Sequence, residues 1–302
     1  MLVQMSFPLL LNQQKVNNKK NINVKEILLK STKILRDKKI DEPYLNSEIL
    51  LAYCLRKERI DLYSKDLIIT SQLLKKYFAL IKKRTKGIPL QYLIGKVNFY
   101  GYDFQIKKGV FIPRPETEIL VEETIKIYKK YFSPNIIKIL DIGTGCGNIA
   151  ISLGKEIENC HITATDISED ALKLAKENAY LLNVKNKIKF IKTNFFSCLN
   201  DKFHIIISNP PYIPENELKN LPLEVKKEPE LALNGGKFGL VYIQKILKQG
   251  WKYLFENGFL ILEIGKGQGD FLKKEKFFSL KLIKFVNDLN NIERIVVLKK
   301  IK

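Results

Sequence analysis

The fold class of this chain is decided by the run Ile139-Leu140-Asp141-Ile142-Gly143-Thr144-Gly145-Cys146-Gly147. Its apolar half predicts a buried β-strand, and the glycines that follow predict a tight turn where the backbone can approach a ligand closely. A helical pattern begins directly afterwards, at Asn148. Strand, glycine turn and helix in this order are typical of a ligand-binding loop in an α/β protein, although a glycine turn alone is a weak signal.

The elements that follow this run predict a parallel sheet. Strand candidates alternate with helix candidates, which is the signature of parallel strands joined by crossover helices. The last two strand candidates are joined by a turn-rich segment, which predicts a final antiparallel pair. We therefore expect an α/β, Rossmann-like sheet of seven strands, drawn from candidates at 136–142, 161–167, 188–192, 204–208, 259–264, 280–286 and 294–299, with helices at 148–157, 169–182 and 240–255.

The chain that precedes this sheet has three parts. Residues 1–22 are polar and aperiodic, and we predict that they form a mobile tail. Residues 23–94 carry apolar side chains at helical spacing, which predicts a small all-α domain with helices that begin near positions 23, 45 and 71. Aromatic residues and glycines are interspersed in residues 95–112 and predict a β-hairpin linker, so the catalytic domain is expected to span 113–302.

The net charge leaves two explanations open. Lysine and arginine total 52 against 32 acidic residues, which gives a formal net charge of +20. Only six of the basic residues are arginine, a bias that compositional drift toward lysine also produces. The excess is concentrated early, because residues 1–110 carry 22 basic and 9 acidic side chains, against 30 and 23 in residues 111–302. An acidic partner would therefore meet the first third of the chain.

Neither a membrane span nor a metal site is predicted. No apolar run approaches the roughly 20 residues that cross a bilayer, and the first residues lack the features of a secretory signal. The four cysteines form no C-x-x-C pair, so neither a disulfide framework nor a zinc site is suggested. A cytoplasmic protein with no membrane association is expected.

Two carboxylates near the glycine turn indicate its ligand. Asp166 lies at the end of the next strand candidate, where a carboxylate can accept both hydroxyl groups of a ribose. The G-x-G-x-G spacing differs from the G-x-G-x-x-G fingerprint that seats a pyrophosphate. Asp141 in front of the turn would repel an anion and favour the cationic amino-acid end of S-adenosyl-L-methionine. This cofactor is therefore expected in place of a nicotinamide dinucleotide.

A second motif, Asn209-Pro210-Pro211-Tyr212, directly follows the strand candidate at 204–208. In a doubly wound sheet the first and fourth strands adjoin, so Asn209 is expected to face the glycine turn. The Asn209 side-chain oxygen and the Pro210 carbonyl can both accept N–H groups of a planar NH2. The prolines make the backbone rigid, and Tyr212 offers a face for stacking. The motif predicts methyl transfer to a planar nitrogen, which positioning can accelerate without a strong base.

Together these motifs resemble the family of methyltransferases that act on planar amines, which includes adenine-specific DNA methyltransferases and protein-glutamine methyltransferases. Three further stretches are similar to one branch, the peptide chain release factor glutamine methyltransferases. They are Phe111-Ile112-Pro113-Arg114-Pro115-Glu116-Thr117-Glu118, Pro89-Leu90-Gln91-Tyr92-Leu93-Ile94-Gly95 and Glu228-Pro229-Glu230-Leu231-Ala232-Leu233. The resemblance covers about residues 23–300.

The resemblance implies a methyltransferase that uses S-adenosyl-L-methionine and methylates the glutamine of the Gly-Gly-Gln motif in class I release factors. It implies substrate docking by residues 23–94, a monomer, and no specific nucleic-acid partner. Phe195 matches a position near the adenine where tryptophan is common, and Asn194 stands where an acidic residue is frequent. The implied cofactor-binding residues are Gly143, Thr144, Gly145, Cys146, Gly147, Asp166, Phe195 and Asn209; the implied substrate-binding residues are Asn209, Pro210, Pro211 and Tyr212, of which Asn209 and Pro210 are catalytic.

Alternative functions share parts of this pattern. A glutamine methyltransferase that acts on a large-subunit ribosomal protein has the same sheet and motifs, but its linker usually reads Pro-Arg-Ser-Pro where this chain has Pro113-Arg114-Pro115-Glu116. A DNA or RNA adenine methyltransferase would suit the positive charge. It would also need a larger domain to read base edges and flip a base than the 70 or so helical residues offer. A non-catalytic binding module would not need both motifs.

Overall fold

The computed structural model describes residues 23–63 and 67–301. The predicted tail at 1–22 lies outside these residues. The chain divides into two compact units, one that ends at Ile81 and one that begins at Lys82. The domain boundaries predicted at 94 and 112 stay predictions.

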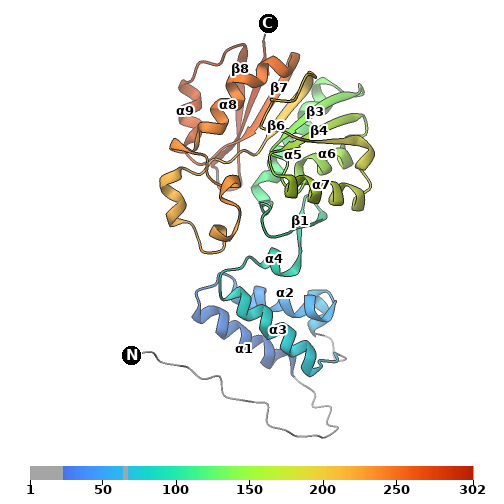
Figure 1. Cartoon of the computed structure of the whole chain (residues 1–302), viewed down its shortest axis with the longest axis vertical. Helices are drawn as coiled ribbons and strands as arrows, with labels where there is room; N and C mark the ends of the chain where they lie inside the picture. Colours follow the sequence, from blue (N-terminus) through green and yellow to red (C-terminus); the bar gives the residue numbers. More distant parts are fainter. Residues whose placement is uncertain (1–22, 64–66, 302) are drawn as a thin grey trace, which may run out of the picture. The chain divides into compact units, whose positions relative to one another are not determined.

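The first unit is helical (Figure 1). Helix α1 begins at Asn23, whose side-chain oxygen accepts a hydrogen bond from the Lys25 N–H at 2.9 Å and satisfies one of the free donors at the helix start. In its core, the buried Tyr77 hydroxyl donates to Ser31 Oγ at 2.6 Å. The predicted N-terminal helical region is confirmed. Its elements are α1 (Val24–Asp37), α2 (Pro43–Leu55), the 3-10 helix η1 (Arg59–Tyr63) and most of α3 (Ser71–Arg84).

The second unit is built on a seven-stranded sheet with the order β5-β4-β3-β6-β7-β9-β8. The first five strands in this order are parallel, and β9 pairs antiparallel with both β7 and β8. The predicted α/β fold with its final antiparallel pair is confirmed. The strands are β3 (Ile137–Ile142), β4 (Cys160–Asp166), β5 (Ile188–Lys192), β6 (Phe203–Ser208), β7 (Leu254–Glu263), β8 (Leu280–Asn287) and β9 (Glu293–Lys300).

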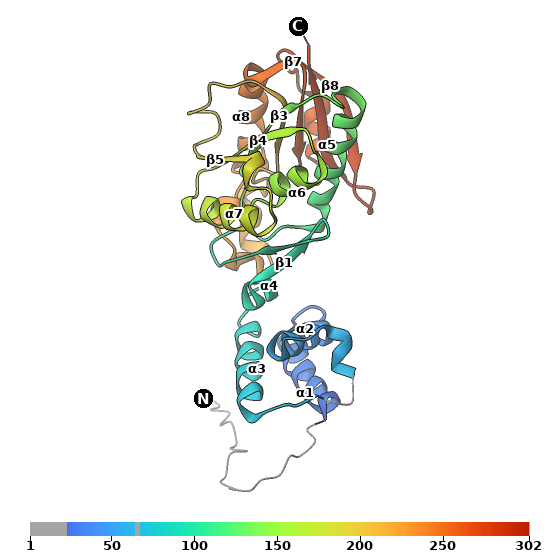
Figure 2. The ribbon, with the colours of Figure 1, turned by 90° about the vertical axis from the view of Figure 1, so that its right-hand side faces the viewer.

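Helices cover both faces of this sheet (Figures 1 and 2). Three of them, α5, α6 and α7, pack on one face, and α8 and α9 pack on the other. Successive side chains of a strand point to opposite faces, so Ile205 and Ile207 of β6 enter the first layer and Ile206 enters the second. The helices are α5 (Glu118–Tyr131), α6 (Asn148–Glu156), α7 (Glu169–Leu181), α8 (Val241–Gly250) and α9 (Gln268–Lys274).

The structure differs from the predicted elements in three places. Helix α5 and the short α9 were not predicted, although α5 carries a clear apolar face. The helix predicted at 240–255 ends at Gly250, because Leu254 already pairs with Phe203 as the first residue of β7. The predicted start of this strand at 259 was wrong, since Asn257-Gly258 lies inside β7 at an irregularity of the pairing with β6 instead of in a turn before it.

The predicted hairpin forms within the second unit. Strands β1 (Lys96–Phe99) and β2 (Tyr102–Gln105) pair antiparallel, and a short helix α4 (Leu90–Ile94) precedes them. The two turn residues Tyr100 and Gly101 have φ values of 52° and 77°, as a tight two-residue turn requires. Phe99 and Phe104 are buried in the same core as α5 and α6. The hairpin is therefore part of the fold of the second unit.

Neither a membrane span nor a metal cluster is found in the described residues. No helix there is long and apolar enough to cross a membrane. No group of three or more His, Cys, Asp or Glu side chains there is arranged to hold a metal ion.

Candidate active site

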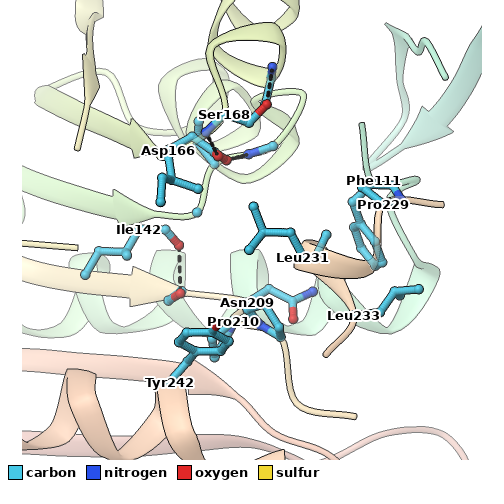
Figure 3. A pocket seen from close by; sticks show the side chains of 18 of the residues that line it. Phe111, Ile142, Asp166, Ser168, Asn209, Pro210, Pro229, Leu231, Leu233 and Tyr242 are labelled. Carbon is cyan, nitrogen blue, oxygen red and sulfur yellow. Dashed lines mark hydrogen bonds between the residues drawn. The ribbon is translucent and has the colours of Figure 1, made fainter. Parts of the chain in front are cut away.

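A cavity of about 530 Å³ lies in the second unit, at the carboxyl ends of β3, β4 and β6. Ligands in open α/β sheets bind at this edge, where the strand order reverses. The segments 142–145, 165–168 and 208–213 form one part of its wall, and the segment 193–195 adds another. Figure 3 shows Asp166 and Asn209 in this cavity. The Ser208 hydroxyl donates to the Ile142 carbonyl at 2.7 Å and so ties the ends of β6 and β3 together.

The glycine loop contributes its first half to the cavity wall. Gly143, Thr144 and Gly145 line the cavity, and the two glycines have φ values of 75° and 57°, which favour glycine. Cys146 and Gly147 lie outside the wall. The Cys146 thiol is buried, and burial raises its pKa to about 12. A Cβ at Gly147 would come within 2.8 Å of the Ile151 side chain and 3.1 Å of Ala175, so this glycine permits close packing of α6 against α7.

Asp141 supports the loop from beneath. Its side chain is fully buried, and Oδ2 accepts a hydrogen bond from the Thr144 hydroxyl at 2.6 Å. Oδ1 is buried without a hydrogen-bond partner in the described residues. Burial, and to a smaller extent the charge of Asp166, raise the pKa of Asp141 to about 7. A cation bound at Thr144 would offset this cost, which agrees with the predicted preference for a cationic group.

Asp166 is held by backbone donors at the end of β4. Its Oδ2 accepts from the Gly145 N–H at 2.9 Å, and its Oδ1 accepts from the Ser168 N–H at 2.8 Å. Burial raises the pKa of the carboxyl, and these hydrogen bonds act in the opposite direction. Each carboxylate oxygen keeps a second lone pair. The side chain is thus fixed at the cavity wall with capacity to accept hydroxyl groups.

Asn209 lies across the cavity from Asp166, at the end of β6 (Figure 3). Its Nδ2 donates to the Thr117 hydroxyl oxygen at 3.0 Å. Within the described residues its Oδ1 makes no hydrogen bond. Pro210, Pro211 and Tyr212 also line the cavity, so the structure brings the whole motif together. The free Oδ1 is an acceptor available to a ligand N–H.

Tyr212 connects the motif to a carboxylate that sequence reasoning missed. Its hydroxyl donates to Glu263 Oε1 at 3.1 Å, and burial together with the nearby Glu263 charge raises the pKa of this tyrosine. Glu263 and Thr117 are each 1% exposed and neither lines the cavity. A signal for Glu263 was present, because it ends an apolar strand as Asp166 does. Thr117 lies inside the stretch 111–118 that was quoted only as a resemblance.

Comparison with known proteins identifies the family. The methyltransferase small domain matches residues 117–246, and the PrmC N-terminal domain matches residues 26–95. The release factor glutamine methyltransferase of Thermodesulfovibrio yellowstonii is 40% identical over 256 residues, which are 84% of this chain and 91% of that protein. The corresponding protein of Aquifex aeolicus is 38% identical over 295 residues, 95% of this chain and 99% of that one. This chain belongs to the release factor glutamine methyltransferase family.

The solved structures that resemble this chain are less similar to it in sequence than the relatives above. A methyltransferase from Pyrococcus furiosus is similar with a TM-score of 0.45 and 21% identity, over 67% of this chain and 90% of that chain. Membership of the release factor glutamine methyltransferase family rests on the sequence relatives, which extend along most of both chains.

Phe195 lines the cavity beside Tyr242 and Lys245. Its ring stacks on Tyr242 with centroids 5.6 Å apart and an angle of 21°. Lys245 Nζ lies 4.4 Å from the ring centroid and 3.4 Å from Asn194 Oδ1. All four side chains line the cavity. Asn194, which stands where the family often has an acidic residue, is therefore paired with a lysine instead of being left as a free acceptor.

Arg114 and Glu228 join two stretches of the family resemblance. Glu228 is buried, forms an ion pair with Arg114, and accepts a hydrogen bond from the Ile112 N–H at 3.0 Å. Arg114 also lies over the Phe111 ring at 4.9 Å and lines the cavity. Arg114 is thus both part of an ion pair in the segment that leads to α5 and part of the cavity wall. Glu116 is exposed.

Gln268 and Gly239 hold the segment after the Asn-Pro-Pro-Tyr motif. Gln268 Nε2 donates to the Tyr212 carbonyl at 2.9 Å and to the Gly239 carbonyl at 3.2 Å. Gly239 has a φ of 69°, and a Cβ there would lie 2.0 Å from the Tyr212 carbonyl oxygen. The loop at 235–239 therefore packs directly against the backbone of the motif.

We expect Gly239→Ala to lower stability and turnover together. The left-handed φ costs about 1–3 kcal/mol for a residue with a side chain, and the contact with Tyr212 must also be relieved by moving the motif. Thermal unfolding and steady-state turnover measure the two effects. Gly95→Ala is the matched control, since Gly95 has a φ of 76° but nothing within 4 Å of its Cβ position. Equal turnover in the two variants would contradict a role of this contact in placing Tyr212.

Proposed function

We propose that this enzyme transfers a methyl group from S-adenosyl-L-methionine to the side-chain amide nitrogen of the glutamine in the Gly-Gly-Gln motif of class I release factors. The observation that carries the proposal is the Asn209 side chain. Its Nδ2 is engaged by Thr117 and its Oδ1 is free in a cavity that also contains Asp166 and the glycine loop. A hydrogen-bond acceptor that faces a nucleoside-binding site can hold the NH2 group of a substrate beside the methyl donor.

The cofactor end of the cavity fits a cationic nucleoside. Asp166 would accept the ribose hydroxyls while Gly145 and Ser168 keep its carboxylate in place. Asp141, whose Oδ1 has no hydrogen-bond partner in the described residues, would stabilise a nearby positive charge through Thr144. Phe195 would contact the base. When bound, S-adenosyl-L-methionine supplies a methyl group on a cationic sulfur.

The substrate end must orient an amide nitrogen that is a poor nucleophile, because its lone pair is delocalised into the carbonyl. Asn209 Oδ1 and the Pro210 carbonyl would accept the two N–H groups and fix the plane of the amide. Orientation of this kind can supply about 7–11 kcal/mol of the barrier reduction. The acceptors would also stabilise the positive charge that develops on nitrogen. Leu231 and Leu233 supply apolar wall beside Asn209 (Figure 3).

The proposed partner is a release factor, and the first unit is proposed to dock it. Relatives of this chain are named as release factor glutamine methyltransferases, which supports this substrate over a ribosomal protein or a nucleic acid. A substrate that acts on the ribosome implies a cytoplasmic reaction. We propose that the enzyme works as a monomer.

The function is tested by incubation with radiolabelled S-adenosyl-L-methionine and a purified class I release factor, followed by mapping of the labelled residue. We expect one label, on the Gly-Gly-Gln glutamine, and none on a factor in which that glutamine is replaced by alanine. Ribosomal proteins and duplex DNA serve as competing substrates. Label on either of them at a higher rate than on the release factor would overturn the proposal.

We expect Asp166→Ala to weaken cofactor binding by roughly 1.5–3 kcal/mol, the range for a hydrogen bond to a charged group. This corresponds to a rise in Kd of about 10–150-fold. Calorimetry with the folded variant measures it. Asp170→Ala, which changes an exposed carboxylate on α7, should leave Kd unchanged. An unchanged affinity in Asp166→Ala would remove Asp166 from the cofactor site.

A further inference from the structure

Arg114 is a cation in the cavity wall with unused hydrogen-bond donors. Its Nη2 forms an ion pair with Glu228. Within residues 23–63 and 67–301, its Nε and Nη1 form no hydrogen bond with another residue. Every nitrogen of a guanidinium carries N–H donors, and the Arg114 side chain is 30% exposed where it lines the cavity. A ligand with oxygen acceptors can therefore bind to it.

The surroundings of Arg114 hold its guanidinium in one place. Pro115 follows it, and the residue before a proline is restricted to extended backbone, which Arg114 adopts with φ −105° and ψ 146°. The guanidinium carbon lies 4.9 Å from the centroid of the Phe111 ring. The buried Glu228 carboxylate is itself fixed, because it also accepts from the Ile112 N–H at 3.0 Å. The unused donors thus belong to a side chain whose position is set before any ligand binds.

Arg114 lies at the substrate end of the cavity. Figure 3 shows Asp166, the proposed ribose contact, at one side of the cavity and Phe111, which lies under the guanidinium, at the other. Burial and the Glu263 charge raise the pKa of Tyr212, and the charge of Arg114 acts in the opposite direction. The guanidinium is therefore close to the Asn-Pro-Pro-Tyr motif. This position favours a contact with the substrate over a contact with the cofactor.

The proposed substrate offers backbone oxygen atoms next to its glutamine. The two residues that precede the glutamine in Gly-Gly-Gln have no side chain, so an enzyme can form hydrogen bonds with them only through backbone N–H and C=O groups. Each carbonyl is a strong acceptor, and a hydrogen bond from a charged donor is roughly twice as strong as one between neutral groups. Glycines also let a backbone come close to a protein wall. The unused donors of Arg114 match these carbonyl groups.

We propose that Arg114 binds the backbone carbonyl groups of the two glycines that precede the substrate glutamine, and that Glu228 is a positioning residue that holds the guanidinium for this contact. The inference rests on the function proposed above and adds how the residues beside the glutamine are recognised. Arg114 does not contact the reacting nitrogen in this arrangement. Its contribution is to the affinity for the Gly-Gly-Gln segment, and that of Glu228 is exerted only through Arg114.

The first test uses a short Gly-Gly-Gln peptide with blocked ends, which carries no terminal carboxylate. In Arg114→Met the KM for this peptide should rise by about 10–100-fold, the size expected for a hydrogen bond to a charged donor, while kcat stays within a few-fold. Arg114→Lys should recover only part of the loss, because lysine keeps the charge but lacks the planar arrangement of donors. An unchanged KM in Arg114→Met would overturn the inference.

Arg294→Met is the matched control for this test. Arg294 also pairs with a buried carboxylate, that of Asp288 at 2.9 Å, and its charge also acts on Tyr212, but it does not line the cavity. Its variant should keep the KM for the peptide. An equal rise in KM in Arg294→Met would show that the loss of any nearby positive charge is sufficient, and would contradict a direct contact by Arg114.

The role of Glu228 is tested by combining variants. Glu228→Gln keeps an acceptor for the Ile112 N–H but weakens the hold on Arg114, so the KM for the peptide should rise by about 2–10-fold, the cost of immobilising a side chain on binding. Added to Arg114→Met, the same change should cause no further rise, because Glu228 acts only through Arg114. A further rise of equal size would remove its positioning role. Thermal unfolding confirms that each variant is folded, and the Arg114 variants test the contact without any change at Glu228.

Calorimetry distinguishes the substrate from the cofactor as the partner of Arg114. The affinity for S-adenosyl-L-homocysteine should be equal in Arg114→Met and the unsubstituted enzyme. A clear rise in Kd would assign the guanidinium to the carboxylate of the cofactor and overturn the inference. With S-adenosyl-L-homocysteine present, the peptide should bind more weakly to Arg114→Met.

The same measurement separates this inference from the proposed function. If the unsubstituted enzyme binds the peptide but methylates neither the peptide nor a release factor, the proposed function is rejected, and the peptide affinity of Arg114→Met still decides the role of Arg114. If the unsubstituted enzyme methylates the peptide and Arg114→Met binds it equally well, only the inference is rejected. If the unsubstituted enzyme does not bind the peptide at all, the inference is rejected as well.

Discussion

Replacement of Asn209 by alanine is expected to lower turnover by about 10²–10³, the loss that follows removal of one transition-state hydrogen bond. The structure supports this size of effect because Asn209 Oδ1 is free in the cavity while Nδ2 is fixed by Thr117. Saturating cofactor should not restore the rate, since the acceptor acts on the substrate nitrogen. Single-turnover kinetics with a release factor substrate measures the effect.

Two further variants sharpen this expectation. Asn209→Asp keeps an acceptor and should retain more activity than Asn209→Ala, although it loses the donor to Thr117. Asn290→Ala, on the exposed turn between β8 and β9, should be unchanged. If a general base elsewhere carried the reaction, Asn209→Ala would lose only a few-fold, and the role assigned to Asn209 would have to be abandoned.

A variant that begins at Lys82 is expected to keep cofactor affinity and to lose about 10²-fold or more in kcat/KM on intact release factor. Binding energy from parts of a substrate far from the reacting group is what positions that group. Residues 1–81 carry 15 basic and 8 acidic side chains, so the full chain should also show a rate that falls as salt rises. The shortened variant should show a weaker salt dependence.

The place of the cut matters for this experiment. A cut at the predicted catalytic boundary of 113 would remove Phe99, Phe104 and Ile112, which are buried in the core of the second unit, and would test folding instead of docking. Deletion of residues 1–22 alone separates the contribution of the tail. Both proteins should methylate a short Gly-Gly-Gln peptide at similar rates. Full activity of the Lys82 variant on intact factor would show that the first unit does not dock the substrate.

Much of the fold could be predicted because its signals are local. The glycine loop, the strand that precedes it and the motif at 209–212 each follow from residues adjacent in sequence. Residues 254–258 were not predicted as strand, although they form the first half of β7. Only its pairing with β6 shows that this segment is a strand, and a local sequence pattern does not reveal pairing between strands that are far apart in sequence.

The site, like the fold, could be predicted only where its signals are local in sequence. Residues that line the cavity could be named from motifs, but Thr117 and Glu263 contact the motif at 209–212 across 92 and 51 residues of sequence. Cys146 and Gly147 belong to the motif and yet lie outside the cavity wall. A motif shows which segment forms a loop, whereas the direction of each side chain depends on packing such as that of Gly147 against Ala175.

The position of β9 has a consequence for how the protein folds while it is being synthesised. This strand follows β8 in the sequence, yet it lies between β7 and β8 in the sheet. During synthesis β7 keeps an open edge until residues 293–300 have left the ribosome, because Glu263 pairs with Ile295 only then. Open strand edges invite aggregation. A nascent chain stalled before residue 293 should therefore be both inactive and sensitive to proteases, and it would depend on chaperones until its last strand is inserted.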